Sequence, residues 1–177
     1  ELKKTEIIKY KMRQPKLTII IPVYNEINTI KNLINKISNL KIDKQIILID
    51  DCSIDGTSEV IKKNTKKLDK IIIHDVNKGK GAAIQSAQKF IEGKYVVIQD
   101  ADLEYEPEDL YSLLEEIDKN NYKVVYGSRV LKNPQNKKSQ NFSHGLRIAG
   151  NIFLTKLSNL INKQKLTDAH TCYKIFE

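Results

Sequence analysis

The sequence predicts an α/β fold, a mostly parallel sheet with helices on both faces. Between residues 17 and 126, short runs rich in Ile and Val alternate with longer segments whose apolar residues recur at helical spacing. Such alternation is typical of βαβ units, in which each helix returns the chain to the edge where the next parallel strand begins. Polar motifs also follow the strand ends, where sheets of this kind bind their ligands.

The predicted strands are apolar runs without polar alternation, as expected of strands that are buried on both faces. They cover 17–23, 45–49, 70–73, 95–98 and 123–126. Helices are expected between and after them, where apolar residues three or four positions apart form one stripe. Ser53 and Asp55 offer helix caps, and Pro107 suits the first turn of a helix. The expected helices cover 26–40, the region around Val60 and Ile61, 81–91, 107–117 and 143–163.

Length and composition indicate one globular domain with a real core, because the chain has 177 residues, of which 40% are hydrophobic and 29% charged. Its two cysteines, Cys52 and Cys172, lie far apart, which argues for a reducing compartment without a disulfide framework. A net charge of +8 suits nucleic acid, anionic lipid or a phosphorylated substrate, and charge alone does not choose. No membrane-spanning run or signal peptide is visible. Since the chain begins at Glu1 rather than Met, we expect an excised part of a longer protein.

Asp100-Ala101-Asp102 is the central motif of the sequence, directly after the predicted strand 95–98. Side chains two apart in an extended segment point the same way, so we expect both carboxylates to face one point. Like charges held this close repel unless a cation lies between them, and carboxylate oxygens suit Mg²⁺ or Mn²⁺. Glu104, two residues further on, could be a third ligand. The ordinary alternative is that these aspartates cap the following turn.

Further candidate binding residues follow the other strands. Tyr24 can stack on a flat ring, and Glu26 can accept hydrogen bonds. Asp51 can accept a hydrogen bond from a base or a ribose. The lysines of 77–81, Lys78 among them, bring positive charge beside glycines to a helix start, where free N–H groups favour phosphate. Arg129 can bind phosphate in bidentate fashion. Each also has an ordinary interpretation as turn, cap or surface ion pair.

In order and spacing, five blocks of the sequence resemble the signature motifs of glycosyltransferase family 2. The likeness is greatest to the branch of dolichol-phosphate mannose synthases and polyprenyl-phosphate glycosyltransferases. The blocks are 21–26 (IPVYNE), 49–57 (IDDCSIDGT), 77–81 (NKGKG), 100–103 (DADL) and 127–129 (GSR). The segment 167–174 (TDAHTCYK) resembles part of the same branch near the acceptor side.

The resemblance implies a GT-A fold, with a Rossmann-like sheet, and an enzyme that transfers a hexose or N-acetylhexosamine with inversion. The donor would be a UDP- or GDP-linked sugar, the acceptor a polyprenyl (dolichyl or undecaprenyl) phosphate, and the cofactor Mg²⁺ or Mn²⁺. The implied nucleotide-sugar contacts are Pro22, Tyr24, Glu26, Asp51, Lys78, Asp100, Ala101, Asp102 and Arg129. The implied metal ligands are Asp100, Asp102 and Glu104, and the implied catalytic residues are Asp100, Asp102, Asp168 and Arg129.

The expected organisation is a basic tail at 1–16, a nucleotide-sugar-binding core at 17–130 and an acceptor-side segment at 131–177, truncated before further elements. Asp168 is the candidate general base for a hydroxyl acceptor. A phosphate acceptor is already an anion, so Asp168 would then position it, and a cap or ion pair stays open. The helix at 143–163 has an apolar stripe beside basic residues, so it could lie at a membrane interface or pack on the open sheet edge. We expect a peripheral or anchored position on the cytoplasmic side of a membrane.

Three alternatives remain open at this point. The first is a family 2 enzyme with a saccharide or protein hydroxyl acceptor. The second, a sugar-phosphate nucleotidylyltransferase, is disfavoured because the first strand leads into Tyr24-Asn25-Glu26 rather than a Gly-rich, Arg-containing loop. The third, a non-catalytic nucleic-acid-binding domain, is disfavoured because acidic residues gather where a polyanion would bind. The three histidines share no metal-ligand spacing, and we expect each to face solvent or a hydrogen-bond partner.

Overall fold

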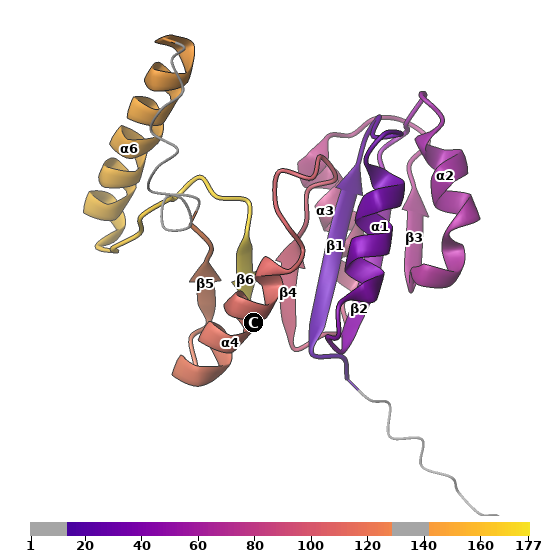
Figure 1. Cartoon of the computed structure of the whole chain (residues 1–177), viewed down its shortest axis with the longest axis horizontal. Helices are drawn as coiled ribbons and strands as arrows, with labels where there is room; N and C mark the ends of the chain where they lie inside the picture. The colour runs from indigo at the N-terminus through magenta and orange to yellow at the C-terminus, as the bar shows by residue number, and fades with distance from the viewer. Residues whose placement is uncertain (1–13, 129–141) are drawn as a thin grey trace, which may run out of the picture.

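The computed structural model describes residues 14–128 and 142–177 (Figure 1). A sheet of six strands runs in the order β3-β2-β1-β4-β6-β5. The strands are β1 (Leu17–Val23), β2 (Lys44–Asp50), β3 (Lys70–Ile73), β4 (Tyr95–Ile98), β5 (Val124–Tyr126) and β6 (Lys174–Phe176). The strands β1 to β4 pair in parallel, whereas β6 is antiparallel to both of its neighbours. The predicted α/β class and mostly parallel sheet are confirmed.

The sequence did not predict β6, which inserts between β4 and β5. This strand has three residues, too few for a periodic pattern, and it lies at the end of the segment 167–174 that the resemblance assigned to the acceptor side. It forms by pairing with strands that are distant in sequence, because Ile175 pairs with Val97 on one side and Val125 on the other. The 167–174 segment is therefore brought beside β4, and so beside the residues that follow β4.

Helices cover both faces of the sheet, as predicted. Their bounds are α1 (Ile30–Asn39), α2 (Thr57–Lys63), α3 (Lys80–Ala87), α4 (Asp109–Asn120) and α6 (Phe142–Asn162), with short 3₁₀ turns η1 (Thr65–Lys67) and η2 (Gln88–Phe90). Residues of α1, α2 and α4 form one core cluster, and residues of α3 form a second on the opposite face. In β1 the side chains alternate between the two: Ile19 and Ile21 join the first cluster, and Ile20 joins the second. Each buried Ile contributes about 1.5–3 kcal/mol to folding, so β1 anchors both layers.

The first helix begins later than predicted, at Ile30 instead of Glu26. Asn25 has a left-handed backbone (φ 55°), and the backbone N–H of Glu26 donates to Thr57 Oγ1 at 2.9 Å. The backbone N–H of Ile27 donates to Asp55 Oδ2 at 3.1 Å, and the Ile27 side chain is exposed. The first residue of α2 and the loop before it thus hold residues 25–27 in a non-helical form. This is a tertiary effect that the helical spacing of the isoleucines could not reveal.

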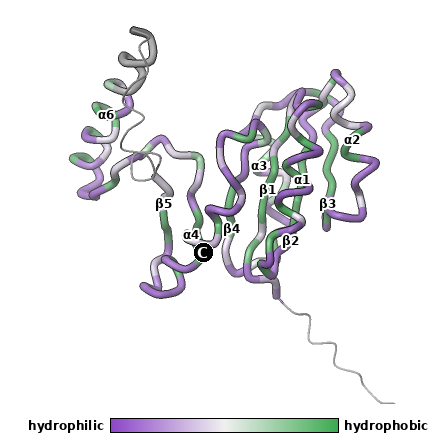
Figure 2. Tube along the Cα trace, viewed as in Figure 1, coloured by the Kyte–Doolittle hydropathy of each residue, from purple (hydrophilic) through white to green (hydrophobic). Residues whose placement is uncertain are grey.

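The helix α6 stands apart from the sheet in Figure 1. Of the two predicted alternatives, it therefore does not follow the one in which it packs on the open sheet edge. Several large apolar side chains on it are exposed. They are Ile152, Phe153, Leu154, Leu157, Leu160 and Ile161. Figure 2 shows that hydrophobic and hydrophilic positions are interspersed along this helix. Within the described ranges, no helix is both long and apolar enough to cross a bilayer.

Candidate nucleotide-sugar site

A cavity of about 460 Å³ lies beyond the carboxyl ends of β1, β2 and β4. Parallel strands end at the same edge of a sheet, so the motifs that follow them meet there. Seven predicted contact residues line it: Pro22, Tyr24, Glu26, Asp51, Asp100, Ala101 and Asp102. The other lining residues are Val23, Asn77, Gly79, Lys80 and Ala83. The cavity thus brings together side chains from sequence blocks that lie as far apart as Pro22 and Asp102.

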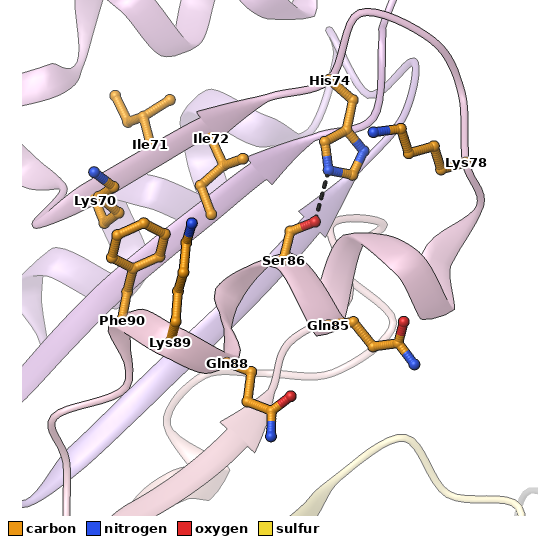
Figure 3. A pocket seen from close by; sticks show the side chains of 10 residues that line it. All are labelled: Lys70, Ile71, Ile72, His74, Lys78, Gln85, Ser86, Gln88, Lys89 and Phe90. Atoms are coloured by element: carbon orange, nitrogen blue, oxygen red, sulfur yellow. Dashed lines mark hydrogen bonds between the residues drawn. The ribbon is translucent and has the colours of Figure 1, made fainter.

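Three of the other predicted site residues do not line this cavity, and a fourth is not among the described residues. Lys78, Glu104 and Asp168 do not line this cavity. The side chain of Lys78 instead borders a second hollow of about 790 Å³ beside β3 and α3, together with His74 and Ser86 (Figure 3). Arg129 falls outside the described residues. The roles that the resemblance gives to these four residues stay predictions.

Asp100 and Asp102 reach the cavity by a route that differs from the predicted one. The strand β4 ends at Ile98, and Ala101 and Asp102 form a turn, so the expectation of an extended backbone was wrong. Asp102 Oδ1 accepts the backbone N–H of Glu104 at 3.0 Å, which is the turn-capping role considered for this motif. The exposed Asp102 keeps its second oxygen free of protein donors among the described residues. Capping and ligand binding are therefore compatible at this residue.

The carboxylate of Asp100 is held by two residues that the sequence did not single out. Lys80, the first residue of α3, forms an ion pair with Oδ1, and the thiol of Cys172 donates to Oδ2. Burial alone would lower the pKa of Lys80, but the hydrogen bond and charge of Asp100 outweigh it and raise that pKa. Burial and the Asp100 carboxylate raise the pKa of Cys172, so it stays a thiol at neutral pH. The position of Lys80 at a helix start could have identified it as a site residue, but the predicted phosphate contact in this block was Lys78.

Asp51 is buried and holds the loop that forms one wall of the cavity. Its Oδ1 accepts the backbone N–H of Lys78 at 2.9 Å and its Oδ2 accepts that of Gly79 at 2.7 Å. His74 Nδ1 lies 2.6 Å from Oδ1. Burial raises the pKa of Asp51, but the hydrogen bonds of His74, Lys78 and Gly79 together lower it below its usual value.

The neighbouring acidic residues of the 49–57 block are structural. Asp50 is fully buried, accepts the backbone N–H of Ser53 at 3.0 Å and also binds the hydroxyl of Ser58. Asp55 accepts from the hydroxyl and the backbone N–H of Thr57, and these bonds lower its pKa. The turn interpretation therefore holds for Asp50 and Asp55, whereas Asp51 also faces the cavity. The predicted helix caps Ser53 and Asp55 were wrong, because the N-cap of α2 is Gly56 and has no side-chain cap bond.

Tyr24 and Glu26 form the outer rim of the cavity. Tyr24 is 47% exposed, so a face of its ring is available to a flat ligand. Glu26 Oε2 accepts the hydroxyl of Thr29 at 2.6 Å, which fixes the carboxylate beside the start of α1. Both positions suit the nucleoside contacts that the resemblance implies.

The donor set of the cavity fits a hard divalent cation. Asp100 and Asp102 both present carboxylate oxygens, the ligands that Mg²⁺ and Mn²⁺ prefer. In residues 14–128 and 142–177, no group of three His, Cys, Asp or Glu side chains could hold a metal. Such a cation would take its other ligands from substrate phosphate and water, as Mg²⁺ usually does in phosphate sites.

Asp168 lies in the segment between α6 and β6 and is buried. Its Oδ1 accepts the backbone N–H of His170 at 3.2 Å, and the next residue, Ala169, donates its N–H to Thr155 Oγ1 on α6. The predicted cap is thus present, and the proposed role toward an acceptor stays a prediction.

The sequence model of glycosyl transferase family 2 matches residues 18–177. A UDP-N-acetylglucosamine–dolichyl-phosphate N-acetylglucosaminyltransferase of Methanococcus voltae is 30% identical over 175 residues, covering 89% of this chain and 68% of that protein. A dolichol-phosphate mannosyltransferase of Pyrococcus furiosus is 32% identical over 155 residues, covering 82% of this chain and 43% of that protein. Another relative, from Methanocaldococcus jannaschii, is matched over 56% of its length, so the chain spans only part of its relatives.

Solved structures agree. The S. aureus TarS structure in complex with UDP-GlcNAc has a TM-score of 0.55 at 28% identity, covering 62% of this chain and 33% of that chain. The glucosyl-3-phosphoglycerate synthase of Mycobacterium tuberculosis, in complex with Mn²⁺ and UDP, has a TM-score of 0.66 at 16% identity, covering 92% of this chain and 57% of that one. The predicted GT-A fold is confirmed. Because the family model covers nearly the whole chain, this protein belongs to glycosyltransferase family 2.

Proposed function

We propose that this chain is the nucleotide-sugar-binding part of an inverting glycosyltransferase with a polyprenyl phosphate acceptor. The donor would be a hexose or N-acetylhexosamine linked to UDP or GDP. Family membership supports the reaction class, and relatives that are named for dolichyl phosphate support the acceptor class. The comparisons favour neither a nucleotidylyltransferase nor a nucleic-acid-binding domain.

One observation carries this proposal: the cavity sets two carboxylates opposite a lysine at a helix start. Asp100 and Asp102 lie on one side, and Lys80 begins α3 on the other. The first N–H groups of a helix have no partner within it, so they favour an anion in front of them. A diphosphate would bind beside these parts once Lys80 turned from Asp100, because α3 and Lys80 offer positive charge and the carboxylates can hold a cation that binds its oxygens.

Asp100 and Asp102 would hold Mg²⁺ or Mn²⁺, and the bound ion would stabilise the negative charge of the departing nucleoside diphosphate. Lys80 would turn from Asp100 toward the diphosphate and neutralise part of the same charge. Tyr24 would stack on the base, and Asp51 would accept from it. Lys78 and Arg129 are predicted to lie near phosphate.

The acceptor would approach from the side of β6 and α6. A phosphate acceptor is already an anion, so the chain needs to orient it rather than remove a proton, and Asp168 is the predicted positioning residue. The exposed apolar side chains of α6, with Lys156 and Lys163 nearby, suit contact with a membrane surface. We therefore propose a peripheral position on the cytoplasmic side of a membrane.

The test is transfer of labelled sugar. The chain is incubated with Mn²⁺ and either UDP-GlcNAc or GDP-mannose, together with vesicles that carry polyprenyl phosphate. The proposal predicts label in the solvent-extractable lipid fraction, from one nucleotide class, and none with Asp102→Asn. Label that appears only on added saccharide or peptide would contradict the lipid acceptor and support a hydroxyl acceptor.

A further inference from the structure

His74 is a buried histidine that the predicted mechanism does not use. It directly follows β3, is 7% exposed, and donates its backbone N–H to Asp50 O at 2.9 Å. Both ring nitrogens have a partner: Nδ1 lies 2.6 Å from Asp51 Oδ1, and Nε2 lies 2.8 Å from Ser86 Oγ on α3. An ionised carboxylate only accepts hydrogen bonds, so the hydrogen in the first contact lies on Nδ1.

Asp51 links His74 to the cavity of Asp100 and Asp102, because its carboxylate contacts the imidazole and the residue lines that cavity. The carboxylate offers about four acceptor positions. Three are taken by protein donors: the N–H of His74 and of Lys78 at Oδ1, and the N–H of Gly79 at Oδ2. The position that remains is on Oδ2, in a residue that lines the cavity. The imidazole therefore helps to decide which side of the carboxylate faces a ligand.

The same carboxylate fixes the loop between β3 and α3. Gly79 has a left-handed backbone (φ 82°) and directly precedes Lys80, the residue that pairs with Asp100. Asn77 and Gly79 of this loop line the cavity. Rotation of the Asp51 carboxylate would release the N–H groups of Lys78 and Gly79, and the start of α3 would lose its anchor.

We propose that His74 is a positioning residue for the donor nucleotide, acting through the Asp51 carboxylate on the Asn77–Gly79 loop. It would touch no substrate atom itself, since it does not line the cavity of Asp100 and Asp102. Its ring instead borders the second hollow, beside Lys78 and Ser86 (Figure 3). This inference rests on the proposed nucleotide-sugar site for its functional half. The effect of His74 on the order of the loop does not depend on a ligand and can be tested without one.

The experiment compares four proteins: the unaltered chain, His74→Phe, His74→Asn and Ser86→Ala. His74→Phe removes both side-chain hydrogen-bond contacts but keeps a planar aromatic ring, which is somewhat larger than the imidazole. His74→Asn keeps an N–H close to the place of Nδ1. Ser86→Ala removes, of the two ring contacts, only the one at Nε2, together with the hydrogen bond of Ser86 Oγ to Ala82 O. Circular dichroism gives the folded fraction of each variant. Two measurements follow: the Kd for UDP and GDP with Mn²⁺, and hydrogen exchange of the backbone amides of Lys78 and Gly79 without ligand.

We expect His74→Phe to weaken nucleotide binding by roughly 10-fold to 100-fold, the usual effect of removing a hydrogen bond to a charged group. The amides of Lys78 and Gly79 should exchange faster by about the same factor, since they lose a fixed acceptor. His74→Asn and Ser86→Ala should stay within about threefold of the unaltered chain. In a transfer assay the loss should fall on the donor KM, with kcat nearly unchanged.

Two results would overturn the proposal. One is a lower melting temperature for His74→Phe without a change in Kd or amide exchange, which would make His74 a packing residue. The other is an equal defect in His74→Asn. If His74→Phe does not fold, His74→Gln replaces it, because its longer side chain carries the amide away from the Nδ1 position. If the unaltered chain binds no nucleotide, the proposed function fails, and amide exchange alone decides the role of His74.

Discussion

Lys80, at the first position of α3, forms an ion pair with Asp100, two residues after the end of β4. The lysine is about half exposed (51%), whereas the carboxylate is mostly covered (18%). The pair joins the two sides of the cavity and occupies an oxygen that a divalent cation would also use. Lys80 and a metal ion therefore compete for Asp100, and a diphosphate would relieve the competition by giving Lys80 a second partner.

Replacing Lys80 by Met should separate metal binding from nucleotide binding. Without its lysine competitor, Asp100 should bind Mn²⁺ more tightly in the absence of nucleotide, by about fivefold for an ion pair of about 1 kcal/mol. Nucleotide binding in the presence of Mn²⁺ should weaken. Titration followed by electron paramagnetic resonance of free Mn²⁺ measures the first effect. The matched control is Lys89→Met, which removes a lysine from the second hollow, beside β3 and α3. It should change neither Mn²⁺ binding nor nucleotide binding. Unchanged Mn²⁺ affinity in Lys80→Met would argue against the competition.

Asp102 and Glu104 should differ sharply when each carboxylate is replaced by its amide. Asp102 lines the cavity and Glu104 does not. Asp102→Asn is expected to lower the transfer rate by roughly 100-fold or more, about 2.7 kcal/mol of barrier. Glu104→Gln should keep the rate within about threefold. An equal loss in both variants, measured as kcat/KM, would mean that Glu104 is a metal ligand after all, as the resemblance implied.

The pH dependence of stability should reflect Asp51. Its pKa is lowered in the folded state from a reference value of 3.8. A lowered carboxyl pKa contributes stability that is present above the unfolded value and is lost as the pH falls through the folded value. The difference in melting temperature between the chain and Asp51→Asn should therefore be constant near pH 6 and shrink below about pH 4. A difference that grows on acidification would contradict the ionised, hydrogen-bonded carboxylate.

The apolar face of α6 can be tested with vesicles. Phe153 and Leu160 are 65% and 78% exposed, so Phe153→Ser with Leu160→Ser should change the free energy of unfolding by less than about 0.5 kcal/mol per site. Sedimentation with anionic vesicles should fall several-fold. Ile54→Ser is the matched control, since Ile54 is 83% exposed on the loop before α2. Equal sedimentation of all variants would mean that α6 does not touch the membrane.

The sequence predicted the parallel half of the fold well because that half is built from local repeats. The runs at 17–23 and 70–73 match β1 and β3 without error. The antiparallel strand β6 was missed because Lys174–Phe176 is held by pairing with β4 and β5 rather than by its own pattern. Ile27 was placed on a helix by spacing, whereas its backbone is held by Asp55 from another loop.

For the site, strand-end position was the useful signal, and it brought seven predicted residues to one cavity. It could not tell Lys78 from Lys80, because both belong to one short glycine-containing loop and only the turn into α3 decides which side chain faces Asp100. The contacts of Cys172 and His74 at the site could not be predicted from the sequence, for a different reason. Each acts through a contact with a residue that is distant in sequence, Asp100 and Asp51.

In our proposal, two carboxylates and a divalent cation bind the diphosphate of a nucleotide sugar in the cavity beyond β4. The most direct test is a thermal-shift panel of UDP- and GDP-sugars, each with and without Mn²⁺, on the chain and on Asp102→Asn. We predict that one nucleotide class raises the melting temperature only when Mn²⁺ is present, and that Asp102→Asn abolishes the rise. A melting temperature that responds to no nucleotide, or that responds equally without metal and in Asp102→Asn, would contradict the claim.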